Sequence, residues 1–262
     1  SLESGTPRFN LLNASYAAFE IRNVTLKNGA SEAGGAITGY AGNLTVNGVS
    51  FVDNSVLRES NCGGGAILFL GESVDKKLRI VNSEFRHNTA DDENCAGGAI
   101  YINGGILEIE QSRFLDNFAR TSGGAIALDI NTSVTILDSL FDGNAVSVSA
   151  GGAISSSFTP STILTIRNTT FTNNSAVIGG AIYKAEGTVA ISNSTFFNNM
   201  ATVEGGALHL TNSGNYSVVN STFYQNNASN GGNVYTTYAS LTVINSIMAG
   251  DSNGGNCSAY AV

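Results

Sequence analysis

The sequence is poor in the residues that mark several common classes of protein. Its 262 residues include no tryptophan, two prolines and three cysteines. Three cysteines are too few for a disulfide-based scaffold, and no Cys-x-x-Cys or Cys/His cluster indicates a zinc site. Lysine and arginine number only 12, against 20 acidic residues, and Lys76-Lys77 is the one adjacent basic pair. Binding to nucleic acid or to an anionic membrane surface needs clustered basic side chains, so both partners are disfavoured.

Long hydrophobic runs are also missing. No uninterrupted apolar run approaches the roughly 18 residues that cross a bilayer, so the sequence predicts no direct membrane insertion by this segment. The first nine residues, SLESGTPRF, lack the basic and apolar regions of a signal peptide. If the protein is exported, we expect its signal to lie outside these residues.

Small and turn-forming residues are abundant instead. The chain contains 31 glycines and 31 asparagines, yet 42% of its residues are hydrophobic. Such a composition favours many tight turns and still provides enough apolar side chains to bury a core. We therefore expect a folded chain.

Two short phrases alternate along the sequence. The first is Gly-Gly-Ala-aliphatic, which begins at Gly34, Gly64, Gly97, Gly123, Gly151, Gly179 and Gly205, with weaker copies at Gly231 and Gly254. The second is Phe-x-x-Asn, which ends at Asn54, Asn88, Asn117, Asn144, Asn174, Asn199 and Asn226. Copies of the first phrase lie 23 to 33 residues apart, a period typical of solenoid proteins.

The segments between these phrases predict short β-strands. LTIRNTTF and VAISNSTF alternate apolar and polar residues, and no segment shows a sustained helical period. A unit of this size cannot bury its apolar face alone, whereas stacked units can. The sequence therefore predicts an all-β fold, a parallel β-helix (β-solenoid) of about nine rungs. At about 4.8 Å per rung it would be roughly 40 to 45 Å long.

We expect residues 1–262 to form a single β-solenoid domain. Residues 1–33 are expected to form an irregular N-terminal rung, residues 34–250 the regular rungs, and residues 251–262 the start of a further rung. Within each rung, Gly-Gly supplies a corner where φ can be positive, and the following Ile points inward with the residue two places later. The phenylalanines are expected to stack along the core.

Two columns of amide side chains are predicted. The asparagines that end Phe-x-x-Asn are expected to hydrogen-bond from rung to rung as a structural ladder, as amides do in cross-β structures. A second, inner column is expected three places before each Phe, at Asn23, Asn82, Gln111, Asp138, Asn168, Asn193, Asn220 and Asn245. An outward column places Arg79 and Glu108 on consecutive rungs, so we predict an exposed ion pair that adds little stability.

The alternation GGAIYI…FLDN…GGAIAL…FDGN resembles the passenger region of the chlamydial polymorphic membrane proteins, over about residues 34–226. The resemblance implies a right-handed β-helix that is carried outside a cell. It also implies export by an autotransporter route and a role in adhesion.

The repeat places two of the three cysteines in the same register. Cys62 and Cys95 each stand two residues before a Gly-Gly, and a rung spacing of about 4.8 Å falls within the roughly 4.4 to 6.8 Å between Cα atoms that a disulfide accepts. We predict a Cys62–Cys95 disulfide and hence an oxidising, extracellular setting. Cys257 takes the inward aliphatic position of GGNC, which predicts a buried thiol.

The acidic loop of Asp91, Asp92 and Glu93 is a candidate for calcium binding. Carboxylate clusters are also the candidates for catalysis, because pectin-cleaving lyases and glycoside hydrolases with this fold use such groups. They are Asp91, Asp92 and Glu93 in one loop, and Glu108 with Glu110 on one strand. The loop is interpreted as solvated, and pairing with Arg79 accounts for the strand. We therefore expect no enzymatic activity and no metal or other cofactor. His87 and His209 stand apart and are expected at surface or satisfied positions.

Eleven Asn-x-Ser/Thr triplets occur, against roughly six expected by chance from the composition. Those at Asn23, Asn168, Asn193 and Asn220 belong to the predicted inner column, where the corner explains them. The candidate N-glycosylation sites are the triplets expected in loops or at outward positions, namely Asn13, Asn43, Asn131, Asn173, Asn215 and Asn227.

Three functions are compatible with these features. The first is a non-enzymatic extracellular or cell-surface adhesin or structural stalk, with a host or neighbouring cell-surface protein or glycan as its partner. The second is a fibre subunit that stacks end to end with itself, because an open solenoid ends in unpaired strand edges. The third is a carbohydrate-binding or polysaccharide-degrading β-helix, for which the available tyrosines are Tyr16, Tyr40, Tyr101, Tyr183, Tyr235 and Tyr238.

Overall fold

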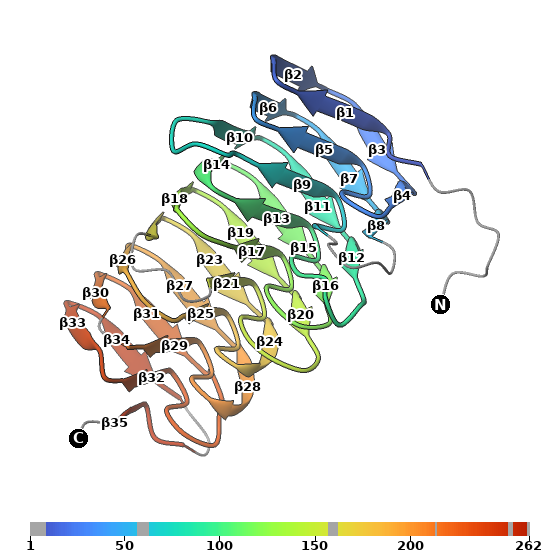
Figure 1. Ribbon diagram of the computed structural model, residues 1–262. Helices are drawn as coiled ribbons and strands as arrows, with labels where there is room; N and C mark the ends of the chain where they lie inside the picture. Colours follow the sequence, from blue (N-terminus) through green and yellow to red (C-terminus); the bar gives the residue numbers. More distant parts are fainter. Residues whose placement is uncertain (1–8, 57–62, 157–161, 213, 251–253, 261–262) are drawn as a thin grey trace.

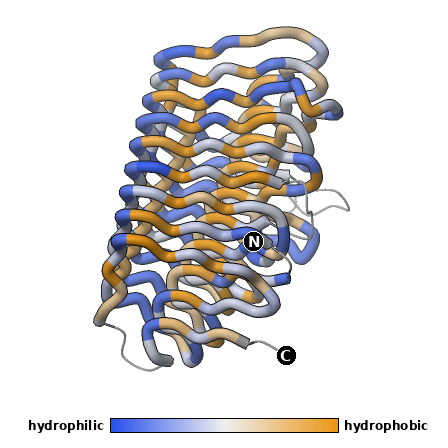
Figure 2. Tube along the Cα trace, turned by 90° about the vertical axis from the view of Figure 1, so that its left-hand side faces the viewer, coloured by the Kyte–Doolittle hydropathy of each residue, from blue (hydrophilic) through white to orange (hydrophobic). Residues whose placement is uncertain are grey.

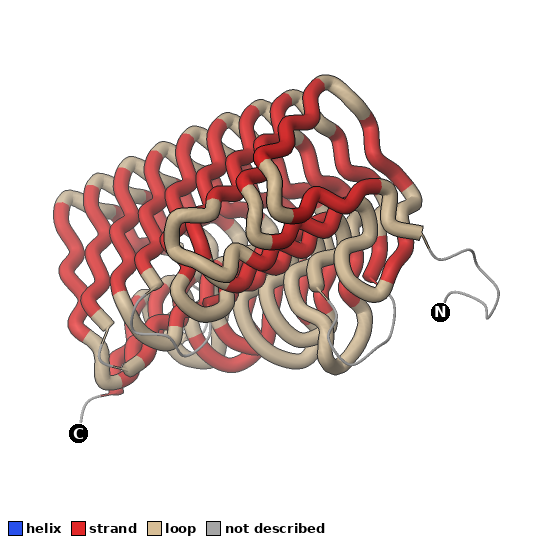
Figure 3. Tube along the Cα trace, turned by 45° about the horizontal axis from the view of Figure 1, so that its top comes forward, coloured by secondary structure: helices blue, strands red, loops and turns tan. Residues whose placement is uncertain are grey.

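The computed structural model describes residues 9–56, 63–156, 162–212, 214–250 and 254–260. These residues contain 35 β-strands and no helix. Figure 3 shows the strands joined by loops and turns. The chain winds in successive rungs from β1 at one end to β35 at the other (Figure 1). The prediction of an all-β solenoid is confirmed.

The strands form four parallel sheets that run the length of the solenoid. The first sheet follows the Gly-Gly corners and consists of β1 (Leu12–Ser15), β5 (Ile37–Tyr40), β9 (Ile67–Leu70), β13 (Ile100–Asn103), β17 (Ile126–Leu128), β21 (Ile154–Ser156), β25 (Ile182–Lys184), β29 (Leu208–Thr211), β32 (Val234–Thr237) and β35 (Cys257–Tyr260). The second sheet consists of β2 (Ala18–Arg22), β6 (Asn43–Asn47), β10 (Lys77–Val81), β14 (Gly105–Glu110), β18 (Thr132–Leu137), β22 (Ile163–Arg167), β26 (Thr188–Ser192), β30 (Asn215–Val219) and β33 (Ser240–Ile244).

The other two sheets are made of shorter strands. The third sheet carries the phenylalanines and consists of β3 (Thr25–Lys27), β7 (Ser50–Val52), β11 (Glu84–Arg86), β15 (Arg113–Leu115), β19 (Leu140–Asp142), β23 (Thr170–Thr172), β27 (Thr195–Phe197), β31 (Thr222–Tyr224) and β34 (Ile247–Ala249). The fourth sheet consists of β4 (Ala30–Ser31), β8 (Ser55–Val56), β12 (Thr89–Ala90), β16 (Phe118–Ala119), β20 (Ala145–Val146), β24 (Ser175–Ile178) and β28 (Met200–Glu204). Residues 9–33, expected to be irregular, thus supply β1 to β4, one strand for each sheet.

The register keeps each motif residue above its equivalent in the next rung. Phe85 pairs with Phe51 on one side and with Phe114 on the other. Seven phenylalanine rings of the third sheet are fully buried and stack, with neighbouring ring centroids between 4.5 Å (Phe51–Phe85) and 4.9 Å (Phe171–Phe196) apart. Figure 2 shows hydrophobic segments recurring at the same place in successive rungs. The predicted phenylalanine column is therefore present.

The Gly-Gly corner uses its two glycines for different reasons. From Gly97 to Gly231 the first has a positive φ, as at Gly123 (62°), where side chains are strained. The second lies against the backbone of the next rung, because a Cβ atom on Gly124 would be 2.1 Å from the carbonyl oxygen of Gly152. The same approach recurs between the second glycines of other rungs, at Gly35, Gly65, Gly98, Gly152, Gly180 and Gly206. This corner therefore requires glycine for stacking as well as for turning.

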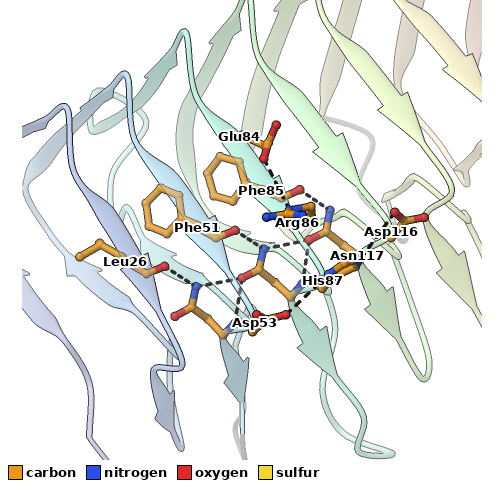
Figure 4. A network of polar contacts seen from close by, with 11 residues as sticks. Leu26, Phe51, Asp53, Glu84, Phe85, Arg86, His87, Asp116 and Asn117 are labelled. Carbon is orange, nitrogen blue, oxygen red and sulfur yellow. Dashed lines mark hydrogen bonds and ion pairs between the residues drawn. The ribbon is translucent and has the colours of Figure 1, made fainter.

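The predicted asparagine ladder is present and buried. Each side-chain amide donates to the oxygen of the next one, at 2.9 Å from Asn117 Nδ2 to Asn144 Oδ1 and from Asn144 Nδ2 to Asn174 Oδ1. Each also donates to a backbone carbonyl of the preceding rung, which belongs to Leu26 for Asn54 and to a phenylalanine for the others, as Asn117 donates to Phe85 at 3.0 Å (Figure 4). The ladder residues Asn54, Asn88, Asn117, Asn144, Asn174, Asn199 and Asn226 are all 0% exposed.

The ladder continues on a different motif at its C-terminal end. Asn226 Nδ2 donates to Asn233 Oδ1 at 2.8 Å, and Asn233 Nδ2 donates to Asn256 Oδ1 at 2.7 Å. Both partners stand where other rungs have the alanine of Gly-Gly-Ala. The weaker GGN copies therefore carry ladder residues, which the sequence interpretation missed.

The second amide column was predicted to lie inside the corner. It is exposed instead. Its members have left-handed backbone conformations, with φ between 48° and 52°, at Asn23, Asn82, Gln111, Asp138, Asn168, Asn193, Asn220 and Asn245. All of these side chains are exposed. Asparagine tolerates this conformation better than other residues with side chains, so the turn, and not burial, explains the column.

The cysteines fall in two different environments. Cys62 lies outside the described residues, so its disulfide with Cys95 stays a prediction; Cys95 is fully buried with Val56, Ala90 and Ala119 beneath the fourth sheet. Cys257 is exposed, contrary to the prediction of a buried thiol. Its strand, β35, is an edge strand of the first sheet among the described residues and pairs with β32.

Candidate functional site

The regular columns are interrupted on three adjacent strands of the first sheet, β21, β25 and β29. Among the described residues, four buried side-chain atoms have no hydrogen-bond partner, and all lie on these strands: Ser155 Oγ, Ser156 Oγ, Lys184 Nζ and His209 Nδ1. An unpaired buried polar group costs about 1 to 3 kcal/mol. We call these four residues the polar interruption. A cluster of such exceptions is expected at a functional or strained site.

Two members of the polar interruption point into the core. Ser156 and Lys184 are register partners on neighbouring strands, and both side chains are 0% exposed. Burial lowers the pKa of Lys184 to about 8, and the carboxylate of Glu186 opposes this shift. Equivalent positions elsewhere hold Leu128 and Leu210, which are buried and apolar. A hydroxyl and an amine thus replace hydrocarbon in the centre of the solenoid.

The outer face of the same strands carries a row of rings. Tyr183, His209 and Tyr235 lie side by side on β25, β29 and β32 and form what we call the aromatic row. The His209 ring centroid is 5.4 Å from that of Tyr183 and 5.0 Å from that of Tyr235, with edge-to-face angles of 71° and 64°. His209 is 5% exposed, whereas both tyrosines are half-buried. Burial raises the pKa of the Tyr183 hydroxyl, and a hydrogen bond with Thr211 opposes the shift.

Glu204 is a charged group that lies within ion-pair distance of the aromatic row. Its Oε2 lies 3.7 Å from His209 Nδ1, too far for a hydrogen bond, and its side chain is 25% exposed. Burial lowers the pKa of His209 to about 4, so the imidazole is neutral at pH 7, although the nearby carboxylate favours the protonated form. The site therefore presents two polar groups that do not satisfy each other.

The part of the chain that holds the polar interruption contains few charged residues. Only five of the 32 charged residues follow residue 142, namely Arg167, Lys184, Glu186, Glu204 and Asp251. The N-terminal half instead carries cross-rung ion pairs, including the predicted one between Arg79 Nε and Glu108 Oε2 at 3.6 Å. The two halves of the solenoid consequently offer different surfaces to a partner.

The predicted carboxylate candidates are spread over that charged half. Glu108 accepts from Lys77 Nζ at 2.6 Å, and Glu110 Oε2 lies 3.3 Å from Arg79 Nη2, so basic groups accompany both carboxylates. Asp91 and Glu93 are exposed in the turn before Cys95, and Asp92 is half-buried. Within the described ranges, no group of three or more His, Cys, Asp or Glu residues could hold a metal ion. Nor does that part of the chain include a helix long and apolar enough to span a membrane.

The two histidines occupy different surroundings. His87 is exposed at a left-handed corner of the Phe-x-x-Asn column, with its Nδ1 3.6 Å from Asp53 Oδ1 and its Nε2 3.7 Å from Asp116 Oδ2 (Figure 4). It is a surface residue between two carboxylates. His209 is buried and part of the polar interruption, so the expectation of a surface or satisfied position fails for it.

The six tyrosines considered for carbohydrate binding do not form one continuous row. Tyr16 and Tyr40 contact each other at the N-terminal end, with ring centroids 5.1 Å apart. Tyr101 lies in the outward column of the aromatic row but is separated from Tyr183 by Ala127 and Ser155. Tyr238 follows β32 and is 56% exposed. The six tyrosines therefore supply two separate groups, the Tyr16–Tyr40 pair and Tyr183 with Tyr235, which have His209 between them.

Most of the glycosylation triplets are exposed. Asn13, Asn43, Asn131, Asn173 and Asn215 have exposed side chains, and Asn227 is half-buried. The four triplets first assigned to an inner column are exposed as well, at Asn23, Asn168, Asn193 and Asn220. Burial therefore does not exclude them as acceptors, and glycosylation at any of these residues stays a prediction.

The polar interruption left a visible signal in the sequence. The inward residue two places after the Gly-Gly-Ala isoleucine or leucine is Phe69, Ile102, Leu128 and Leu210 in four rungs, but Ser156 and Lys184 in the two between Leu128 and Leu210. Aligning every rung on this position would have revealed the change from apolar to polar. The pairing of His209 with two tyrosines follows from the same alignment.

Comparison with known proteins defines the class to which this fold belongs. The profile of a family described as "Right handed beta helix region" matches residues 9–227. The chain therefore belongs to the right-handed β-helix family, and the hand implied by the chlamydial resemblance agrees with it.

One curated protein shares part of the sequence. The chain is 33% identical over 152 residues to the probable autotransporter YfaL of Escherichia coli strain K12. The match covers 51% of this chain and 12% of that protein. No solved structure matches the chain.

Proposed function

We propose that this chain is a rigid β-helix passenger, displayed on or released from a cell surface, that acts as an adhesive stalk and has no enzymatic activity. The partial similarity to a probable autotransporter supports export. The observation that carries the structural part of the proposal is the unbroken pair of axial columns, seven stacked phenylalanines and the buried asparagine ladder. A β-helix cross-linked in this way along its axis suits a spacer that must hold a binding surface away from a membrane.

The absence of activity is proposed from the chemistry of the carboxylates. A glycoside hydrolase needs one carboxyl group that stays protonated and one that stays ionised. Glu108 and Glu110 instead lie within ion-pair distance of Lys77 and Arg79, an arrangement that accounts for both carboxylates without a catalytic role. Turnover of a polysaccharide by the purified chain, abolished by Asp92→Asn or Glu108→Gln, would contradict this part of the proposal.

Adhesion is testable with the isolated chain. Fluorescent beads coated with the folded protein are expected to bind host or neighbouring cells several times more often than beads coated with an equal amount of the heat-unfolded protein. The readout is the number of beads per cell by flow cytometry. Equal binding by the two bead preparations, across cell types, would contradict an adhesive role and leave only a structural one.

The predicted disulfide bears on the compartment in which the protein works. A Cys62–Cys95 bond would close a loop of about 33 residues and stabilise the fold by roughly 3 to 4 kcal/mol. In the oxidised protein we expect thiol labelling under native conditions to modify Cys257 alone, because its side chain is exposed. Cys257→Ser should then abolish labelling. Labelling of Cys62 and Cys95 without a reductant would show that the bond is absent.

A further inference from the structure

We propose that the aromatic row, together with Glu204, binds a neutral oligosaccharide that lies along the solenoid axis. The proposal rests on the adhesive function above and names its ligand class and its site. It assigns a role to the outward members of the polar interruption, which the structural columns leave unexplained.

The spacing of the row fits an extended ligand. Tyr183 and Tyr235 lie two rungs apart, which corresponds to about 9.6 Å along the axis. Each tyrosine offers an apolar ring with a polar tip, and both are half-buried, so little side-chain freedom is lost on binding. The C–H face of a sugar ring packs against such a surface, and in an extended chain one sugar ring would pack on each tyrosine with a further ring between them.

The polar groups of the row call for hydroxyl donors and acceptors. His209 Nδ1 is buried without a hydrogen-bond partner, and Glu204 Oε2 lies 3.7 Å away. A ligand hydroxyl would hydrogen-bond to the partly exposed carboxylate of Glu204. The half-buried Thr211 and Thr237 follow His209 and Tyr235 by two residues on the same outer face and add further hydroxyls. Polar groups that converge beside aromatic rings are typical of sites for small polar ligands.

The charge distribution selects a neutral ligand. A sulfated or sialylated glycan would need basic side chains near the site. Beyond residue 142 the basic residues are Arg167, on the second sheet, and Lys184, whose side chain is fully buried. The carboxylate of Glu204 beside His209 accepts hydrogen bonds from hydroxyls but repels anionic groups, and Glu186, which acts on the pKa of Lys184, adds a second negative charge to this region.

A second pair of exposed aromatic residues lacks the histidine and the carboxylate that accompany the aromatic row. Phe197 and Tyr224 are exposed on the third sheet, with ring centroids 6.1 Å apart and planes within 13° of parallel. Their stacked arrangement turns the ring faces toward each other, and no ion pair or histidine accompanies them among the described contacts. Tyr224 is therefore a matched control for the tyrosines of the row.

The experiment measures binding of the whole chain to defined oligosaccharides. Cellotriose, maltotriose and tri-N-acetylchitotriose are the neutral probes, and a heparin trisaccharide is the anionic one, with affinities measured by isothermal titration calorimetry. We expect at least one neutral probe to bind and the heparin probe not to bind. Tyr183→Ala and Tyr235→Ala should each weaken binding about tenfold, the size expected for one lost aromatic contact. Tyr224→Ala should leave the affinity unchanged.

Conservative variants and the adhesion assay keep the outcomes distinct. Tyr235→Phe, which keeps the ring, is expected to lose less affinity than Tyr235→Ala, and Glu204→Gln should weaken binding without changing the circular dichroism spectrum. The proposal is overturned if no neutral probe binds the folded chain, if the heparin probe binds instead, or if binding survives a Tyr183→Ala/Tyr235→Ala double variant. Beads coated with the double variant are compared with beads coated with the wild-type chain. If both adhere to cells equally well, the adhesive function stands and this site is not its basis. Binding to a protein receptor alone would likewise overturn the saccharide assignment.

Discussion

Replacing Asn144 with alanine is expected to destabilise the protein by about 4 kcal/mol. Asn144 Oδ1 accepts hydrogen bonds from the backbone N–H and the Nδ2 of Asn117, and its own Nδ2 donates to the Phe114 carbonyl at 2.9 Å. The substitution leaves those buried partners unpaired, at about 1 to 3 kcal/mol for each group that finds no other partner. It also divides the ladder in two. The midpoint of urea unfolding, followed by circular dichroism, measures the effect.

A matched control exists one residue before the ladder in the next rung. Asn173 is exposed and has a φ of 55°, and the preceding rung has Gly143 at the same position. Asn173→Gly is therefore expected to change the stability by less than about 1 kcal/mol. If Asn144→Ala and Asn173→Gly shifted the unfolding midpoint equally, the ladder would not be a major source of stability.

Replacing Lys184 with leucine is expected to stabilise the protein by about 3 kcal/mol at pH 7. The buried amine has no hydrogen-bond partner, and burial lowers its pKa from 10.5 to about 8. Each pKa unit corresponds to about 1.4 kcal/mol of preference for the neutral form. Leucine suits the position, because Leu128 and Leu210 occupy it in nearby rungs. Lys27→Leu, at an exposed position of β3, is the control and is expected to have little effect.

The pH dependence gives the Lys184 prediction a second readout. The pKa of Lys184 in the folded protein lies below its value in the unfolded chain, so the folded state binds the proton less well. Protonation of the buried Lys184 amine destabilises the folded protein. This effect is absent above about pH 10.5, grows as the pH falls to about 8, and is constant below that. The difference in stability between the Lys184→Leu variant and the wild type should therefore shrink between pH 8 and pH 10.5. A constant difference over this range, or none at pH 7, would show that the amine is paired in the folded protein.

The sequence predicted those parts of the fold in which one residue type recurs at one place. Phe85 and Asn88 each have an equivalent in every neighbouring rung, so their stacking and hydrogen bonding followed from the repeat and the rung spacing. The side of the chain on which a column lies was harder to predict. Asn82 and its equivalents are exposed because their left-handed turn faces outward, and a repeated asparagine is equally compatible with a buried ladder. Only backbone geometry separates the two.

The candidate site was predicted less well, because it consists of departures from the repeat. Ser156 and Lys184 break an apolar column for two rungs, so no repeated phrase marks them. His209 was expected at a surface or satisfied position because no partner residue repeats with it. Its partners are the tyrosines Tyr183 and Tyr235, which lie in the same column but are of another residue type. In a repeat protein, function is expected where a column changes its chemistry, so each column has to be inspected rung by rung.

The asparagine ladder also makes the two directions along the solenoid inequivalent. In every step from Asn54 to Asn256, the amide nitrogen points toward the next rung and the amide oxygen toward the previous one. A rung added after Asn54 must offer an oxygen acceptor, which explains why Asn233 and Asn256 can continue the series from another motif. The aligned amide dipoles add up along the axis, so one end of the ladder presents hydrogen-bond donors and the other end presents acceptors. In a rung that stacked upside down, a donor would face a donor or an acceptor would face an acceptor. The ladder therefore disfavours that orientation.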